Sequence, residues 1–586
     1  MRKGQNFVYL LAAFAFLLLD SPKVEAKKKK EYVEPPYIGF EGQYSFSMPG
    51  EFSKTYSNID KLDTQVAETI KIEKTRTPAN ASVASEGGMS PALKTLRNRY
   101  LNDVKTGADL GRLLNEMDRN YDSYPDDAKF FAARLMPVQA FEGFAWKMLP
   151  IIRQSRMAQE AAVGILRGLS SQLNIRFPDN ENDAVFQYMT QPQAGDATAF
   201  HGNFANLNVQ FVPKGDDKGE RIMQMYMSRM MVGDPDSPGK ITQAIKRIEA
   251  LNFSNNPIVM DAKVRFGDSM MDNNSDPKRF HFIGDAERYA VLSRMHRRMA
   301  TLSVLLAYDF NGFIEYRQEI AHHLGVDIAK SKAKETAADA LGERLAARTG
   351  LNHAFELQGL TRENRVGPNG VIKSYPNLFK LRTDSQREYK GEFKALQGKA
   401  LPIGNIYTIA AYHHLERSVD FMNASWKLMN SPGHTSSNIL EVEFLGARDK
   451  EITEALKAMA DMTPAASAPT GRYVLHSVIE NKTVAVDLRN FFFYPPQNLQ
   501  SLLPKSFDKG ANGANKSNAM VVTTINGKQT AYRDHTQGRA TGWDQAAFKK
   551  IFPDLANGNQ VDENQKILMS SRGGRLASSV LFSFVR

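Results

Sequence analysis

The sequence predicts a mainly α, multi-domain protein in which a large irregular helical region is followed by a small α+β C-terminal domain. Apolar residues recur at helical spacing through much of residues 91–463, whereas residues 471–586 contain short alternating segments separated by turn residues. Between them, residues 463–471 are rich in Pro, Ala, Ser and Thr, which is typical of a boundary. A chain of 586 residues is also long enough for more than one domain.

Residues 1–26 have the pattern of a secretory signal peptide. The basic start MRKGQN precedes an uninterrupted apolar run at residues 7–19. This run is shorter than the roughly 20 apolar residues that a membrane-spanning helix needs. Val-Glu-Ala at 24–26 places small residues where signal peptidase reads them, so cleavage after Ala26 is predicted. An uncleaved N-terminal anchor is the alternative interpretation.

The chain contains no cysteine. A eukaryotic exported protein of this size would ordinarily carry disulfides, so their absence favours a bacterial envelope protein. The predicted location is the periplasm or the outer membrane surface. The absence of cysteine also excludes thiol catalysis and cysteine-based metal or iron–sulfur sites.

The formal charge is +11 at pH 7. Outside the cytoplasm, such a charge favours anionic envelope polymer or lipid head groups as partners. The basic residues are spread along the chain, however, and only residues 27–30 form a basic run. A soluble basic surface is therefore the simpler interpretation, and no nucleic acid partner is expected.

Residues 27–90 are predicted to be an N-terminal extension. Within it, residues 37–48 are typical of one or two strands, and residues 75–90 have the composition of a flexible linker. Ser90 followed by Pro91 predicts a helix start. Serine accepts hydrogen bonds from the free amides of a first helical turn, and proline suits the first helical position.

Helical periodicity continues from there to about residue 463 without a fixed-period repeat, so a solenoid is not predicted. Pro137 and Pro150 are expected to kink or divide the second helix. The predicted helices cover residues 91–118, 126–172, 219–232, 240–251, 285–324, 328–348, 404–430 and 448–461.

The C-terminal domain is predicted to begin with two strands around a turn at residues 480–482. A hairpin follows at residues 520–533, because Asn526-Gly527 suits a tight turn with positive φ at both central residues. The remaining predicted elements are a short helix within residues 543–552 and a strand within residues 578–586.

Two doubled histidines lie within one helical turn of carboxylates, which raises the question of a split metal site. On helical wheels, both polar groups lie opposite the apolar stripe of their own helix. We therefore predict two solvated polar faces with local His–carboxylate contacts. A metal site between the two faces is the alternative. The polar groups are Glu315, Glu319 and His322 in one segment, where His323 lies near a boundary, and His413, Glu416 and Asp420 in the other, beside His414.

Other candidate metal sites are weaker. The run IMQMYMSRMM at residues 222–231 places three methionines on one helical stripe, as packing residues would be, so no copper site is predicted. Residues 272–277 begin like a calcium loop, but Pro277 and Ile283 occupy positions where an EF-hand needs Gly and Glu. No metal and no cofactor are predicted.

No catalytic residue is assigned. The HExxH and GxSxG motifs are absent from the sequence. His476, Asp534 and His535 lie in the C-terminal domain, where they are candidates for a site assembled in space, but such residues are also common in exposed loops.

The sequence thus favours an interaction role over an enzymatic one. We expect an exported bacterial envelope protein that is a structural or interaction component of a multi-protein assembly for secretion, motility or surface functions. Its expected partners are other envelope proteins. The alternatives are an exported hydrolase that acts on envelope polymer through an unrecognised site, and a binder of acidic polymer or of a membrane surface.

Overall fold

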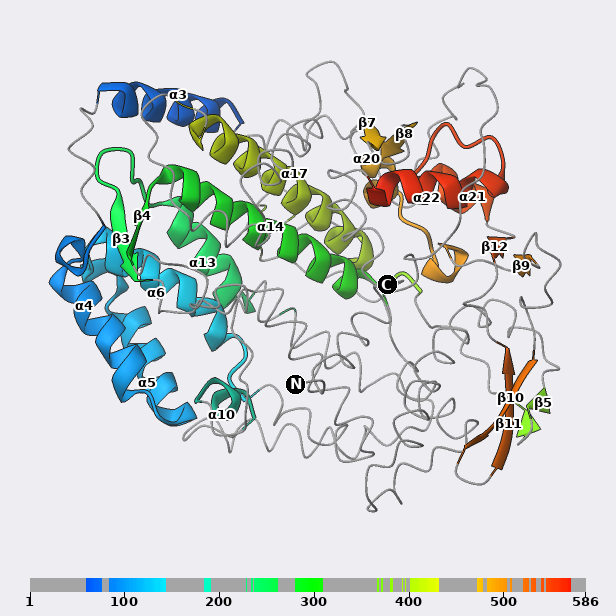
Figure 1. Cartoon of the computed structure of the whole chain (residues 1–586), viewed down its shortest axis with the longest axis horizontal. Coiled ribbons are helices and arrows are strands. Elements are labelled where there is room, and N and C mark those ends of the chain that lie inside the picture. The colour runs from blue at the N-terminus through cyan, green and yellow to red at the C-terminus, as the bar shows by residue number, and fades with distance from the viewer. Residues whose placement is uncertain are drawn as a thin grey trace.

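In the computed structural model, two long helices lie side by side through the described core: α14 (Asp285–Ala307) and α17 (Ile403–Met429) (Figure 1). The described part of the chain is mainly helical, which confirms the coarse class that the sequence predicts. The structure describes residues 59–75, 84–143, 184–190, 228, 233–234, 237–261, 280–308, 366–367, 370–371, 380–382, 391, 393, 396, 401–429, 431, 472–477, 482–502, 506–508, 520–525, 528–533, 539–541 and 544–570.

Shorter helices and strands surround this pair. The other α-helices are α3 (Ile59–Thr75), α4 (Pro91–Asn98), α5 (Gly107–Arg119), α6 (Asp126–Gln139), α10 (Ala184–Thr190), α13 (Lys240–Glu249), α20 (Leu488–Phe493), α21 (Gln545–Lys549) and α22 (Val561–Ser570). The strands are β1 (Gly233–Asp234), β2 (Ser237–Pro238), β3 (Ile258–Asp261), β4 (Phe280–Ile283), β5 (Val366–Gly367), β6 (Gly370–Val371), β7 (Arg472–Ser477), β8 (Lys482–Asp487), β9 (Ser506–Asp508), β10 (Met520–Ile525), β11 (Lys528–Arg533) and β12 (Arg539–Thr541).

The described strands pair two by two in antiparallel sheets. Strands β10 and β11 pair from Met520 opposite Arg533 to Ile525 opposite Lys528, and the predicted turn residues Asn526 and Gly527 lie outside the described residues. Strands β7 and β8 pair from Arg472 opposite Asp487 onward. Both hairpins predicted from the sequence are therefore confirmed, as is the short helix that α21 forms.

The predicted helix start at Ser90 is also confirmed. The Ser90 Oγ accepts from the amide of Leu93 at 3.1 Å, and Pro91 is the first residue of α4. The predicted continuous helix over 91–118 is wrong, however, because the backbone passes through a π-turn and becomes extended at Val104. Helix α5 then starts anew at Thr106, whose side chain and Asp109 form a capping box.

The helices α13 and α17 begin and end within two residues of the predicted bounds. Helix α6 ends at Gln139, two residues after Pro137, where the sequence predicts a break. The predicted helix over 285–324 is interrupted, and its part beyond residue 308 lies outside the described residues. Helix α14 ends at Ala307, because Tyr308 takes an extended conformation and pairs with Leu381.

Helix α3 lies in the predicted N-terminal extension 27–90, between the predicted strands and the predicted linker, and it contacts the core directly. Leu62 and Val66 are buried, and the Thr69 and Ser254 hydroxyls lie 2.9 Å apart. The Ser431 Oγ donates to the Glu73 carboxylate at 2.6 Å, close to the end of α17. No helix was predicted from the sequence at this position.

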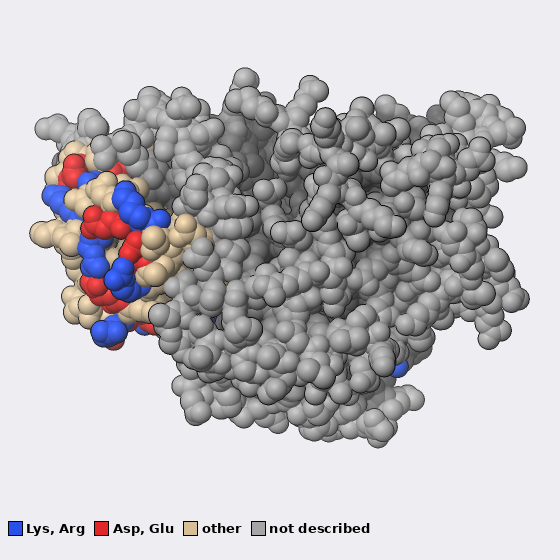
Figure 2. Space-filling view, turned by 90° about the horizontal axis from the view of Figure 1, so that it is seen from below, with Lys and Arg blue, Asp and Glu red and all other residues tan. Residues whose placement is uncertain are grey.

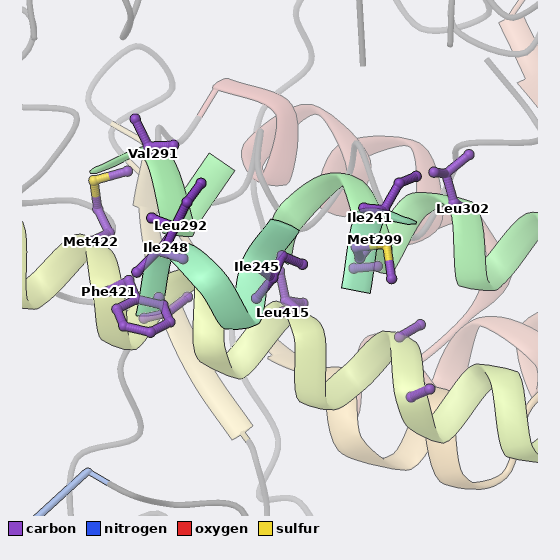
Figure 3. Packing of buried hydrophobic residues seen from close by; sticks show 14 of the residues in the cluster. Ile241, Ile245, Ile248, Val291, Leu292, Met299, Leu302, Leu415, Phe421 and Met422 are labelled. Carbon is purple, nitrogen blue, oxygen red and sulfur yellow. The ribbon is translucent and has the colours of Figure 1, made fainter. Parts of the chain in front are cut away.

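The hydrophobic core runs through the junction of α13, α14 and α17. The isoleucines of α13 at 241, 245 and 248 follow the i, i+4, i+7 spacing of an amphipathic helix, and all are buried. Figure 3 shows them in one layer with Leu292 and Met299 of α14 and Leu415 and Phe421 of α17. This packing fixes α13 across the central pair.

Several predicted segments lie outside the described residues. They include the signal peptide 1–26, the strands at 37–48, the helix beyond residue 143 with Pro150, and the final strand at 578–586. The helices predicted at 328–348 and 448–461 and, apart from Ser228, at 219–232 also lie outside. These remain predictions, as do the domain boundaries.

The described surface carries charges of both signs. At the end of the molecule where α4 and α5 lie in Figure 1, basic and acidic side chains alternate in Figure 2. Two of the ion pairs there join Arg99 to Glu116 and Arg112 to Asp109. No helix among the described residues has the length and apolar character needed to cross a membrane.

One glycine provides a test of this packing. A Cβ at Gly404, near the start of α17, would lie 2.7 Å from the carbonyl oxygens of Ala307 and of Arg382. We expect Gly404→Ala to lower the free energy of unfolding by about 1–3 kcal/mol, because backbone must move. Urea denaturation measures this. Gly87→Ala is the control, since its Cβ would meet only the Ser85 hydroxyl at 3.4 Å. Equal stability of the two variants would contradict the close approach.

Candidate functional site

Small polar residues let α14 and α17 approach each other closely. The Ser293 Oγ donates to the Ser418 carbonyl at 2.7 Å, and their two hydroxyls lie 3.2 Å apart. Two helical turns toward the other end of the pair, the Ser425 Oγ donates to the Ala286 carbonyl at 2.8 Å. Because these contacts hold the backbones together, larger polar side chains in neighbouring turns are pressed against each other.

The residues brought together in this way are His296 of α14 and His414 of α17. Their Nδ1 atoms are 3.1 Å apart, and both side chains are buried. The His296 ring stacks on Phe421, and the Phe393 ring meets His414 edge-on at 4.6 Å between centroids. A hydrogen bond between two Nδ1 atoms requires one of them to carry a proton and the other to accept it.

Glu249, the last residue of α13, completes the polar cluster. Its carboxylate lies 3.8 Å from the His296 Nε2 and accepts from the Arg417 Nη2 at 3.2 Å. Burial alone would raise the pKa of Glu249, but His296, Arg417 and Arg288 outweigh it, so the pKa lies below its ordinary value. An ionised carboxylate is therefore held against the His296 imidazole.

His414 is held neutral by its surroundings. Burial, together with the neighbouring rings of His296 and His413, lowers the pKa of His414 well below its ordinary value of 6.5. At neutral pH the two-histidine contact therefore contains a neutral His414. We call Glu249, His296, His414 and Arg417 the histidine cluster.

A second polar group lies on a different face of α17. The His413 Nδ1 contacts the Glu416 carboxylate at 3.0 Å within the helix. Phe393 and Phe493 cover the His413 ring, at 5.4 and 6.1 Å between centroids. Asp420, one turn further on, is also buried.

The prediction that His413, Glu416 and Asp420 form a solvated face is therefore wrong. The helical wheel correctly placed these residues on one side of the helix, but other parts of the protein cover that side as well as the apolar side. His413 is 1% exposed, because Phe393 and Phe493 of α20 pack against its ring. The other predicted group, from Glu315 to His323, lies outside the described residues.

Metal binding has no support in the part of the chain that the structure covers. Within it, no three His, Asp or Glu side chains are arranged to hold a metal ion together. The methionine run 222–231, apart from Ser228, and the loop 272–277 lie outside it, as do Asp534 and His535. His476 lies in β7.

Sequence reasoning missed the partners that matter most. Glu249 and His296 come from separate helices and carry no motif, and His296 is 118 residues from His414. The available signal was the doubled histidine itself within a long helix whose aromatic and apolar residues extend beyond a single stripe. A helix of that kind is buried all round.

No protein family, curated protein or solved structure matches this chain. What the cluster can do therefore follows from its own residues. It can bind a proton, share it between two rings, and stabilise the positive charge with Glu249.

Proposed function

We propose that the chain is an exported bacterial cell-envelope protein that acts as a structural or interaction component of a multi-protein envelope assembly. The observation that carries this proposal is the N-terminal pattern. A basic start, the apolar run 7–19 and the Val-Glu-Ala sequence at 24–26 match the three parts of a signal peptide. The lack of cysteine supports a bacterial envelope.

The described core supports a structural role. Its buried and half-buried polar residues join helices to one another or to the end of α17: Ser293 to Ser418, Glu249 to Arg417, and Glu73 of α3 to Ser431. Such cross-helix contacts make a rigid body, which suits a protein that presents surfaces to partners. The proposed partners are other envelope proteins, with anionic polymer or lipid head groups second because of the charge of +11.

We also propose that residues 471–586 form a small α+β domain at the C-terminal end. Hairpins β7–β8 and β10–β11 support it. This domain would dock on the helical region through α20, because Phe493 meets Tyr412 of α17 edge-on at 5.5 Å. Limited proteolysis between residues 463 and 471, followed by gel filtration, tests whether the two parts stay associated.

Export is tested first. N-terminal sequencing of the protein from its native cell is expected to begin at Lys27, because cleavage follows Ala26. Replacing Ala26 by a large residue, as in Ala26→Trp, is expected to leave the precursor uncut, whereas Lys28→Gln serves as the control and is expected to be cut normally. A mature wild-type protein that retains Met1 would contradict the cleavage.

The interaction role is tested by crosslinking and co-purification from native envelopes, followed by measurement of the size of the complex. One stable stoichiometric partner is the expected result. The absence of a partner, together with turnover of envelope polymer by the purified protein, would instead point to the hydrolase.

A further inference from the structure

We infer that the contact between His296 and His414 is a proton-operated joint between α14 and α17, closed while the pair holds a single Nδ1 proton and opened when both Nδ1 atoms are protonated. The inference rests on the 3.1 Å distance between the two Nδ1 atoms and on the burial of both rings. The ligand of this site is the proton itself.

The geometry allows one Nδ1 proton and excludes two. With one proton, one ring donates and the other accepts, which closes the hydrogen bond. With two, both Nδ1 atoms are donors and their hydrogens point at each other. When both rings also keep their Nε2 protons, two positive charges face each other inside the protein. Like charges at such a distance repel strongly where water is excluded. The rings must then separate.

The first additional proton is well accommodated. When His296 is protonated on both nitrogens, its Nδ1–H still donates to His414, and its Nε2–H faces the Glu249 carboxylate at 3.8 Å. The contact therefore stays closed in this state. Only a further proton, on the Nδ1 of His414, opens it.

The joint is placed where opening has the largest structural consequence. The neighbouring Ser293–Ser418 contact holds the same two helices together one turn away. The His296 ring also stacks on Phe421, which belongs to the core layer of Figure 3. Separation of the rings therefore loosens the central helix pair.

Among the described residues, two carboxylates near the pair are directed at other ring nitrogens. Glu249 faces the Nε2 side of His296, and Glu416 contacts His413 instead. Phe393, not a charged group, faces His414 from the 391–396 segment, and α20 presents Phe493 to the neighbouring His413. Among the described residues, the titratable and charged groups near the cluster include Glu249 from α13, Arg288 and His296 from α14, and His413, His414, Glu416, Arg417 and Asp420 from α17.

The expected pH dependence has a definite sign. Because His414 is neutral in the folded state and takes up a proton once unfolded, the open form gains as pH falls below about 6.5. Its population is expected to rise by roughly tenfold for each pH unit below that value.

Asp420 cannot produce this effect. Burial, together with Glu416 and Asp63, raises its pKa to about 7, which favours the folded state as pH falls.

Hydrogen exchange of the full-length protein, corrected for the intrinsic rate, tests the joint at about pH 7.5 and at about pH 5. Peptides from α14 and α17 are expected to exchange at least tenfold faster at the lower pH. His414→Asn is expected to remove most of this increase, because the amide can replace the Nδ1 contact without taking up a proton. The matched control is His413→Asn, which lies next to it but contacts Glu416, and it should retain an acid-induced increase in exchange.

A second variant keeps the test decisive if His414→Asn fails to fold. The chain has no cysteine, so Ser293→Cys with Ser418→Cys introduces a single disulfide across the joint, where the two hydroxyls lie 3.2 Å apart. The oxidised form should lose the acid-induced exchange and regain it on reduction. Equal exchange of wild-type α14 and α17 at both pH values, or an acid-induced increase that survives the disulfide, would overturn the inference.

The use of such a joint in the cell rests on the proposed function. An exported protein meets the pH of the surroundings, so the joint would loosen the core of an envelope component in acid. Failure of export would remove this use without changing the proton response, and N-terminal sequencing and hydrogen exchange report the two separately.

Discussion

Replacement of Asp285 by alanine is expected to lower the free energy of unfolding by about 3–5 kcal/mol. Asp285 is the first residue of α14 and is 2% exposed. Its carboxylate accepts from the Phe253 amide at 3.1 Å and the Ser254 hydroxyl at 2.6 Å. It also pairs with the Arg288 Nε at 2.6 Å. Loss of the carboxylate leaves a buried guanidinium without its counter-ion.

The remaining bonds of Arg288 explain why this change affects more than one helix. Its Nη1 donates to two backbone carbonyls at the C-terminal end of α13, at 3.2 and 3.3 Å. Arg288 and Asp285 together therefore fasten α13 to the start of α14. Without the carboxylate, the arginine either stays buried with an uncompensated charge or leaves the carbonyls of α13 unsatisfied.

Urea denaturation near pH 7 measures the effect. Arg112→Ala is the control, because the ion pair of Arg112 with Asp109 is on the surface and its side chain is 78% exposed. It is expected to cause no measurable change. Asp285→Asn should lie between the two, since it keeps an acceptor but loses the charge. Equal stability of Asp285→Ala and Arg112→Ala would show that the pair does not hold the helices together.

The parts of the fold that could be predicted have their signals within a few neighbouring residues. Ser90 and Pro91 define a helix start through their own side chains, and Asn526-Gly527 defines a hairpin through its own backbone preferences. The end of α14 has no such local signal. It depends on Tyr308 pairing with Leu381, a residue more than seventy positions away. Periodicity alone therefore carried the predicted helix too far.

In the candidate site, too, some features follow from neighbouring residues and others depend on contacts between distant elements. A helical wheel correctly groups His413, Glu416 and Asp420, because this grouping depends only on the turn of one helix. Whether that face meets water depends on how many other elements contact α17, and here α3, α14 and α20 all do so. His296 reaches His414 only through this packing. The chemistry of the site could thus not be derived from spacing along the chain.

The buried face that contains Asp420 also destabilises the folded state at neutral pH. Burial, followed by the nearby Glu416 and Asp63 carboxylates, raises the pKa of Asp420 to about 7. The ordinary value is 3.8. A carboxyl group whose pKa is raised on folding destabilises the folded state as pH rises above the unfolded value, and the full cost is reached above the folded value. For Asp420 this cost amounts to roughly 4 kcal/mol at most.

Asp420→Asn is therefore expected to raise the free energy of unfolding by up to roughly 4 kcal/mol near pH 8. The amide has nearly the same shape as the carboxylate but carries no charge that burial can destabilise. Because the wild-type carboxyl group takes up its proton as pH falls, the gain should shrink to less than about half by pH 5. Urea denaturation of both proteins at the two pH values measures the difference.

Asp63→Asn is the matched control, since it makes the same chemical change on α3 at a side chain that is 53% exposed. Asp63 pairs with Lys427 at 2.6 Å in solvent, so loss of its charge is expected to give no comparable gain. A gain for Asp420→Asn that does not vary with pH would mean that improved packing, not removal of a buried charge, is responsible. Destabilisation near pH 8 would mean that the ionised carboxylate is instead required by the fold.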